Sequence, residues 1–157
     1  MMNNRGFSAI ELLVSLAVTG ILTGMAAFQF SHQSEHTRLS YASRSLLSDL
    51  RWARQMAVSQ SEEIRLILDA ATERYWIERA SRPGVVVGTV KDFKDGKQGY
   101  EGIDLAGSSN GDMIRFFPKG TTNTWTTITL RNNDHEERRI TLLATGRVRL
   151  YEEKNDK

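Results

Sequence analysis

Residues 7–30 read FSAIELLVSLAVTGILTGMAAFQF, and this stretch decides how the rest of the chain is interpreted. It contains 24 residues, no Lys or Arg, and a single charged side chain, Glu11. As an α-helix it would be about 36 Å long, enough to cross the hydrocarbon core of a bilayer. No second apolar run of this length follows. The sequence therefore predicts one N-terminal transmembrane helix over residues 7–30.

Glu11 is the unusual residue in this segment. A carboxylate so close to the start of an apolar helix costs about 2.5–3.5 kcal/mol on membrane-insertion scales, unless it finds a partner. Two ordinary interpretations are a secretory signal peptide cut near residues 25–27, where Met-Ala-Ala offers a small-residue site, and a plain signal anchor. Neither interpretation accounts for an acidic residue at the start of the apolar core.

The residues before the apolar segment form a short polar leader, Met-Met-Asn-Asn-Arg-Gly, with one positive charge. Gly6, Phe7 and Glu11 together resemble the class III signal of type IV prepilins and pseudopilins, although Ala9 stands where that family more often has Leu. The resemblance implies that a prepilin peptidase removes residues 1–6 by cutting after Gly6. It also implies that the new N-terminal residue, Phe7, is N-methylated.

Cleavage after Gly6 would place a new ammonium group about one helical turn from the carboxylate of Glu11. In a stack of parallel, staggered helices, Glu11 of one subunit can pair with the Phe7 amine of its neighbour. Pairing would offset the cost of the charge and fix the register of assembly. We therefore assign an assembly role to Glu11.

The composition after residue 30 is that of one globular domain of about 127 residues, with 39% hydrophobic and 25% charged residues in the whole chain. Lys and Arg number 21 against 19 Asp and Glu, and removing the leader with Arg5 leaves 20 against 19. A nearly neutral chain has no overall field for nucleic acid, so such binding would need local clustering. The absence of cysteine excludes disulfides, thiol nucleophiles and Cys-ligated metals.

Hydrophobic periodicity predicts an amphipathic helix over residues 31–59 and an antiparallel β-sheet over residues 62–151. The helix carries an apolar stripe made of Leu39, Leu46, Leu50, Ala53 and Ala57. Strands are expected at 63–68, 73–79, 85–87, 113–117, 126–131, 138–143 and 148–151, with a break at Pro83-Gly84 and a hairpin turn at 132–135. Five glycines within residues 93–111 favour a surface loop there.

The C-terminal third resembles the GspH/FimT family, which comprises minor pilins of type IV pili and the H-type minor pseudopilin of type II secretion. Three segments carry this resemblance: IRFFPKG at 114–120, RITL at 139–142 and TGRVRL at 145–150. It implies an α+β, type IV pilin-like fold in which a long N-terminal helix packs on antiparallel β-sheet. The resemblance does not extend to residues 80–112, for which we assign no family from the sequence.

Catalytic and metal-binding patterns are weak in this sequence. His32 and His36 have the i, i+4 spacing of a metal-binding pair, but no third ligand is evident, so two exposed histidines are the favoured interpretation. The acidic residues at 134, 136 and 137 lack the calcium-loop pattern. Phosphate-binding loops, nucleophile elbows and zinc-protease motifs are absent from the sequence. We expect no enzyme, no cofactor and no metal.

Arg147 and Arg149, in the sequence Gly146-Arg147-Val148-Arg149, are candidate DNA-binding residues. On a strand they would point to the same face about 6.6–7 Å apart, close to the spacing of phosphates along one DNA strand. The resemblance to FimT proteins with a G-R-x-R element implies DNA binding during uptake. Alternatively, the arginines keep an edge strand soluble, an interpretation that the acidic residues at 152 and 153 favour.

The sequence as a whole predicts a minor pilin-like subunit of a type IV pilus. Such a subunit is stored in the bacterial inner membrane and then built into a periplasmic or cell-surface filament. Its expected partners are other pilins or pseudopilins, the prepilin peptidase and the inner membrane, with DNA as an additional candidate. The alternatives are the H-type pseudopilin of a type II secretion system and an unrelated membrane-anchored extracytoplasmic domain.

Overall fold

The computed structural model describes the backbone of residues 8–95 and 98–152, and the side chains of these residues except 25–34 and 152. The predicted leader, with Gly6 and the adjacent Phe7, lies outside the described residues. The chain divides into two compact units, Met1–Ser34 and Glu35–Lys157, which we describe separately. We call the second unit the head.

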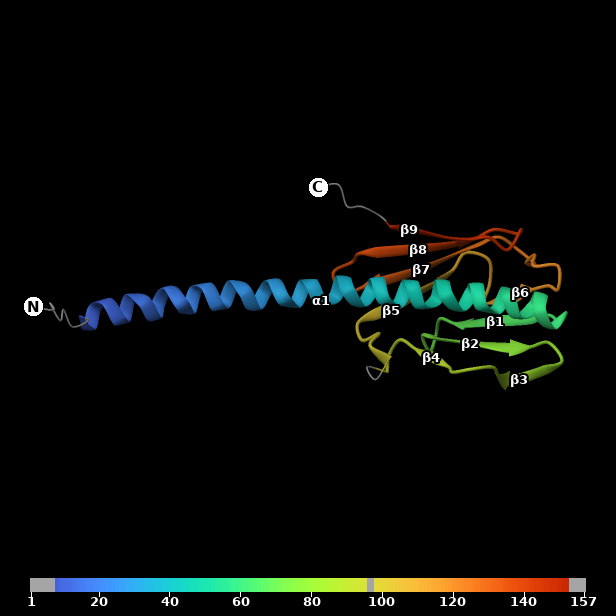
Figure 1. The fold of residues 1–157 in the computed structure, drawn as a ribbon, viewed down its shortest axis with the longest axis horizontal. Coiled ribbons are helices and arrows are strands. Elements are labelled where there is room, and N and C mark those ends of the chain that lie inside the picture. The colour runs from blue at the N-terminus through green and yellow to red at the C-terminus, as the bar shows by residue number, and fades with distance from the viewer. Residues whose placement is uncertain (1–7, 96–97, 153–157) are drawn as a thin grey trace, which may run out of the picture. The chain divides into compact units, whose positions relative to one another are not determined.

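Helix α1 spans Ala9–Gln60, so it contributes to both units (Figure 1). In the first unit three hydroxyl groups donate to the carbonyl oxygens four residues earlier, at 2.7–2.8 Å. They belong to Ser15, Thr19 and Thr23. These bonds satisfy the polar groups of the segment within the helix itself.

The predicted transmembrane helix over residues 7–30 is not confirmed. Within the described residues, no helix is both long and apolar enough to cross a membrane. Phe7 and the side chains of residues 25–30 lie outside that description.

The head contains two antiparallel sheets instead of the one sheet that we expected from the sequence. The first sheet has the order β3-β2-β1-β6, and β4 also pairs with β2. Its strands are β1 (Ile64–Asp69), β2 (Arg74–Arg79), β3 (Arg82–Val86), β4 (Lys91–Asp92) and β6 (Met113–Phe116). The second sheet has the order β5-β7-β8-β9 and consists of β5 (Ile103–Ser108), β7 (Thr126–Asn132), β8 (Glu137–Leu142) and β9 (Val148–Glu152).

Both sheets lie alongside the C-terminal half of α1, and one hydrophobic core joins all three elements (Figure 1). The predicted apolar stripe of the helix is buried, with every member fully inaccessible to solvent: Leu39, Leu46, Leu50, Ala53 and Ala57. Tyr75 and Ile77 of β2 also point into the core, while Arg74 and Trp76 point outward, as strand alternation predicts. The α+β fold class, a helix packed on antiparallel sheet, is confirmed.

The prediction of a surface loop over residues 93–111 is wrong. This segment contains β5, and the side chains of Phe93 and Tyr100 are buried. Their rings form a chain of contacts that runs from Tyr41 on the helix through Tyr100 and Phe93 to Tyr75, with centroid separations of 5.6, 5.2 and 5.7 Å. The glycines suggested a loop, but the apolar residues between them supply enough buried surface to order the segment.

Pro83 and Gly84 lie within β3 instead of before it, but the pairing with β2 is irregular at this point, with a register shift between the Arg82–Arg79 and Val86–Glu78 pairs. Strand β3 is the edge of its sheet. A proline on an edge strand removes no hydrogen bond that the sheet needs, so the strand can contain it.

Candidate functional site

In the first unit, every large aliphatic side chain that the structure describes is exposed. These residues are 50–69% exposed: Ile10, Leu12, Leu13, Val14, Leu16, Val18, Ile21 and Leu22. Glu11 lies among them in the first turn of α1, and its N–H donates to the Ser8 carbonyl at 3.0 Å. A helix with this surface needs apolar partners to cover it. The predicted partner of Glu11, the Phe7 amine, lies outside the described residues, so this pairing stays a prediction.

Many arginines of the head pair with carboxylates. Glu63 accepts hydrogen bonds from Arg115 at 2.7 and 2.8 Å and from Arg65 at 2.9 Å. The hydrogen bond from Arg115, aided by Arg65, lowers the pKa of Glu63 from 4.5 to about 2. Arg131 and Arg139 likewise donate to Glu137 and lower its pKa. These arginines tie neighbouring strands together rather than offering free charge to a ligand.

Arg147 and Arg149 differ from those arginines. Both are exposed, and neither has a carboxylate partner among the described side chains. Between and beyond them, Val148 and Leu150 pack against the core. Arg149 therefore lies on the outward face of β9, whereas Arg147 immediately precedes this strand.

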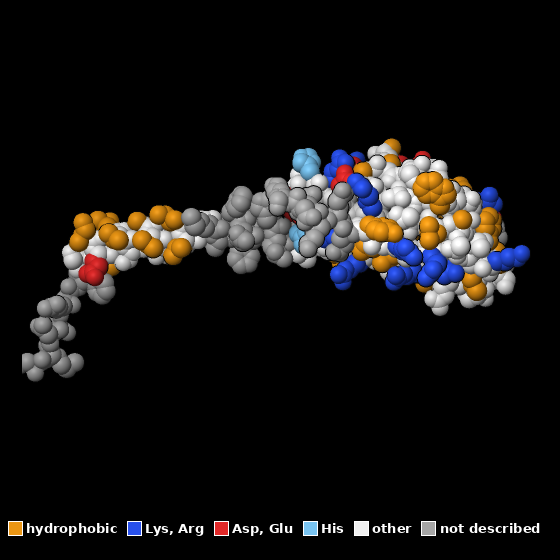
Figure 2. Space-filling view, turned by 90° about the horizontal axis from the view of Figure 1, so that it is seen from above, with side chains coloured by type: hydrophobic (Ala, Val, Ile, Leu, Met, Phe, Trp, Pro, Cys, Tyr) orange, Lys and Arg blue, Asp and Glu red, His pale blue; other side chains and the backbone are white. Residues whose placement is uncertain are grey.

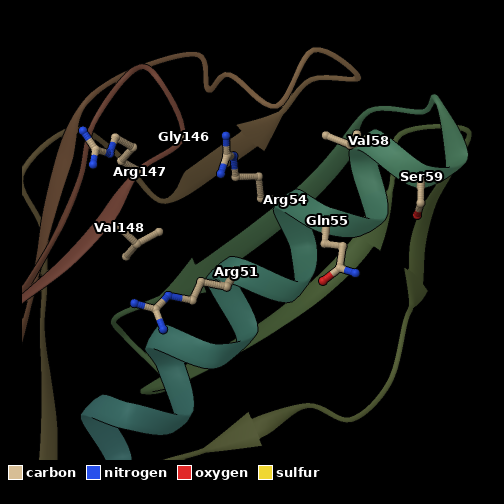
Figure 3. Close-up of a pocket in the computed structure, with 8 residues that line it drawn as sticks. All are labelled: Arg51, Arg54, Gln55, Val58, Ser59, Gly146, Arg147 and Val148. Carbon is tan, nitrogen blue, oxygen red and sulfur yellow. The ribbon is translucent and has the colours of Figure 1, made fainter.

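The structure adds two arginines that we had not assigned to any site, Arg51 and Arg54 of α1. Together with Arg147 they line an open groove of about 650 Å³. The remaining lining residues are Gln55, Val58, Ser59, Gly146 and Val148. Figure 3 shows Arg51 and Arg54 rising from the helix on the side that faces Arg147 and Val148. Arg149 is not part of this lining.

Arg54 is fixed in place by the turns that it touches. Its Nε donates to the carbonyl of Gly120 at 2.8 Å. Gly146 lies so close that a Cβ built on it would be 2.0 Å from the Gly120 oxygen and 2.7 Å from Nε of Arg54. The position therefore requires glycine, and the absent side chain is what allows the arginine to reach between the two turns.

Figure 2 shows Lys and Arg side chains gathered along one face of the head. Arg44, on the same helix as Arg51, is exposed and has no carboxylate partner among the described side chains. The sequence signal for this surface was the placement of Arg44, Arg51 and Arg54 off the buried stripe of α1. That placement could show that they face away from the core, but not which strand they meet.

The histidine pair does not form a metal site in the described part of the chain. His36 lies 3.3 Å from a carboxylate oxygen of Glu136, and the side chain of His32 lies outside the described residues. No group of three His, Asp or Glu side chains that could hold a metal ion occurs among the described residues.

Comparison with known families decides the class of the chain. Residues 42–146 match the family of the type II transport protein GspH, and residues 1–27 match the prokaryotic N-terminal methylation motif. The chain belongs to the GspH family. No curated protein matches it at a significant level.

Two solved structures share the fold. The minor pseudopilin EpsH of the Vibrio cholerae type 2 secretion system is 16% identical, with a TM-score of 0.60, and the match covers 73% of this chain and 97% of EpsH. The type IV minor pilin FimU of Pseudomonas aeruginosa is 21% identical, with a TM-score of 0.59, and the match covers 75% of this chain and 91% of FimU.

Family membership and the methylation motif give the general function: the chain is a minor pilin or pseudopilin of a type IV pilus or a type II secretion system. Members of this class are structural subunits that act in filaments rather than enzymes. The methylation motif indicates pilin-like processing.

Proposed function

We propose that the chain is a minor subunit of a type IV pilus. It is cut after Gly6 by a prepilin peptidase, N-methylated on Phe7, and built into the filament or its tip through the helix at residues 7–30. The observation that carries this proposal is the exposed apolar surface at the start of α1, where Glu11 is the single charged side chain of residues 7–30. Before assembly the helix is held in the bacterial inner membrane, and afterwards the head faces the periplasm or the cell surface.

Glu11 gives the proposed assembly its register. In a filament core made of apolar helices, an unpaired carboxylate is costly, whereas one that meets the Phe7 ammonium of a neighbouring subunit is neutralised. A subunit at the wrong axial height would leave both groups unpaired. The pairing therefore favours one stagger between neighbouring helices.

Processing can be tested by the intact mass of the chain expressed with a prepilin peptidase. The expected mass is that of a chain that begins at N-methylated Phe7. A chain that begins near residue 28 would mean that ordinary signal peptidase had acted, and it would contradict the proposal.

The choice between pilus and secretion can be tested by deleting the gene in its host. Loss of surface pili with normal export of secreted proteins is the expected result. The alternative is the H-type pseudopilin of a type II secretion system, for which export would fail and pili would remain. EpsH and FimU are both too distant in sequence to decide this point.

A second candidate function is DNA binding by Arg147 and Arg149, favoured by their exposure without carboxylate partners among the described side chains. We expect weak, sequence-independent binding of duplex DNA, at about 10⁻⁴–10⁻⁶ M, with a salt slope of roughly −2 for two phosphate contacts. Changing both arginines to Gln should remove most of this binding, while Arg44→Gln serves as a control for general charge. Absence of salt-dependent binding at low ionic strength would leave only the assembly role.

A further inference from the structure

The groove between α1 and β9 combines positive charge with an apolar floor. Arg51, Arg54 and Arg147 contribute guanidinium groups, Val58 and Val148 contribute aliphatic surface, and the lining contains no acidic residue. Elsewhere in the head, carboxylates neutralise arginines such as Arg65, Arg74 and Arg115. Uncompensated arginines around an apolar hollow fit an anionic ligand that also has apolar side chains.

The strand beside the groove has a free edge. In the described part of the second sheet, β9 pairs only with β8, so its other edge offers backbone N–H and C=O groups for pairing. Extended peptides commonly bind such edges by adding a strand. Val148, the first residue of this strand, lines the groove together with Arg51 and Arg54 of α1.

We propose that this groove docks an extended acidic segment of a neighbouring filament subunit, which adds a strand to the free edge of β9. This proposal rests on the proposed function as a filament subunit. Side chains alternate along a strand, so a segment with acidic residues at every second position can direct carboxylates to the arginines. The intervening side chains point to the opposite face of the strand, and the methylene groups of the acidic side chains cover Val58 and Val148.

The lining favours a peptide over a nucleic acid. None of the eight lining residues is aromatic, so the groove offers no surface on which bases could stack. The arginine best placed for a DNA backbone, Arg149, lies outside the groove on the outward face of β9. Docking of a peptide and binding of DNA would share Arg147, but only docking uses Arg51 and Arg54 and only DNA binding uses Arg149, so substitutions at Arg51 and Arg149 separate them.

The groove is also preorganised for a carboxylate. The hydrogen bond from Nε of Arg54 to Gly120 fixes this side chain before any ligand arrives. A guanidinium that is already ordered loses less conformational entropy on binding than a free one. Arg51 and Arg147 are exposed and can adjust to the ligand.

The test uses the full-length chain in a nonionic detergent and a fluorescent seven-residue peptide of alternating Glu and Val. Fluorescence anisotropy should show binding that weakens as salt is added. Arg51→Gln should reduce the affinity roughly three- to fivefold, the range expected for one partly exposed ion pair. Arg44→Gln removes an equally unpaired charge of the same helix outside the groove and should leave the affinity unchanged.

Two further measurements separate strand addition from simple charge attraction and from DNA binding. The same peptide with alternate backbone amides N-methylated should bind much more weakly, because it cannot complete the ladder with β9. Arg149→Gln should weaken duplex DNA binding and spare the peptide. The proposal would be overturned if Arg51→Gln left the peptide affinity unchanged, or if the methylated peptide bound as tightly as the unmethylated one. It would also be overturned if duplex DNA displaced the peptide and this displacement depended on Arg51.

Failure of this proposal can be told apart from failure of the proposed function. A chain that is cut after Gly6 and enters filaments, yet binds no acidic peptide, would reject the docking groove alone. A chain that is not processed at Gly6 would reject the filament role, whatever the groove binds.

Discussion

Gly146 shows how a single missing side chain shapes the head. Its φ is +76°, in the left-handed region, and a Cβ on it would collide with the backbone oxygen of Gly120. We predict that Gly146→Ala destabilises the head by roughly 3 kcal/mol or more, because the turn must move and Arg54 must leave its carbonyl partner.

The matched control for this substitution is Gly84→Ala. Gly84 has a similar φ of +80°, but a Cβ there would meet nothing within 4 Å. Its substitution should therefore cost only the left-handed backbone strain, about 1–2 kcal/mol. Thermal unfolding followed by tryptophan fluorescence measures both variants, and equal losses would show that the contact with Gly120 has no energetic effect.

The lowered pKa of Glu63 makes the stability of the head depend on pH. Its pKa in the folded state is about 2, below the ordinary value of 4.5, so the unfolded chain binds more protons between these two values. The stabilisation is fully present above pH 4.5 and is lost as pH falls towards 2. Glu63→Gln should therefore lower the melting temperature at pH 7 and flatten its decline below pH 4.5. Glu101→Gln, at a side chain that is 71% exposed, should leave the decline unchanged.

For individual residues, the sequence could predict the position of some functional candidates but not of others. Strand alternation sufficed to predict that Arg149 is exposed on β9, whereas Arg147 precedes that strand. The meeting of Arg147 with Arg51 and Arg54 depends on how β9 lies against α1, across about 90 residues of chain. Local patterns contain no information on that approach, so the groove could not be foreseen.

Helix α1 carries the main stability of the head through its buried stripe. Leu46 is completely buried, so Leu46→Asp would place an unpaired carboxylate in the core shared by both sheets. We predict a loss of several kcal/mol, a large part of the roughly 5–15 kcal/mol that stabilises an ordinary domain. Arg44→Asp, on the exposed side of the same helix, should have little effect. A cooperative melting transition near that of the wild type for Leu46→Asp would contradict this assignment.

The elements differ in how far periodicity could predict them. The long helix and the strands from β6 to β9 were predictable because turn residues separate clear apolar patterns. Strand β5 was missed because glycines stand next to its apolar residues, and its order depends on pairing with β7 and on the contacts of Phe93 and Tyr100. The division into two sheets was also missed, since alternation shows which side chains face inward but not which strands are neighbours.

For the whole molecule, the proposed filament role predicts that Glu11→Ala separates membrane insertion from assembly. Removing a charge should not hinder insertion of an apolar helix. Assembly should fail, because the Phe7 ammonium of a neighbouring subunit would lose its partner. Membrane fractionation and immunoblotting of sheared filaments measure the two steps. Entry into filaments at the wild-type level would show that Glu11 does not set the register.

The contact of Arg54 with the turns at Gly120 and Gly146 also bears on how this surface can evolve. The contact fixes the turn before β9 through one side chain and two backbone positions, so few substitutions are acceptable there. Arg147 and Arg149, which follow in the sequence, are exposed and lie outside the hydrophobic core. Selection can therefore exchange them for acidic or neutral residues at little cost in stability. Related filaments could thus acquire different binding partners while they keep the same backbone at this edge.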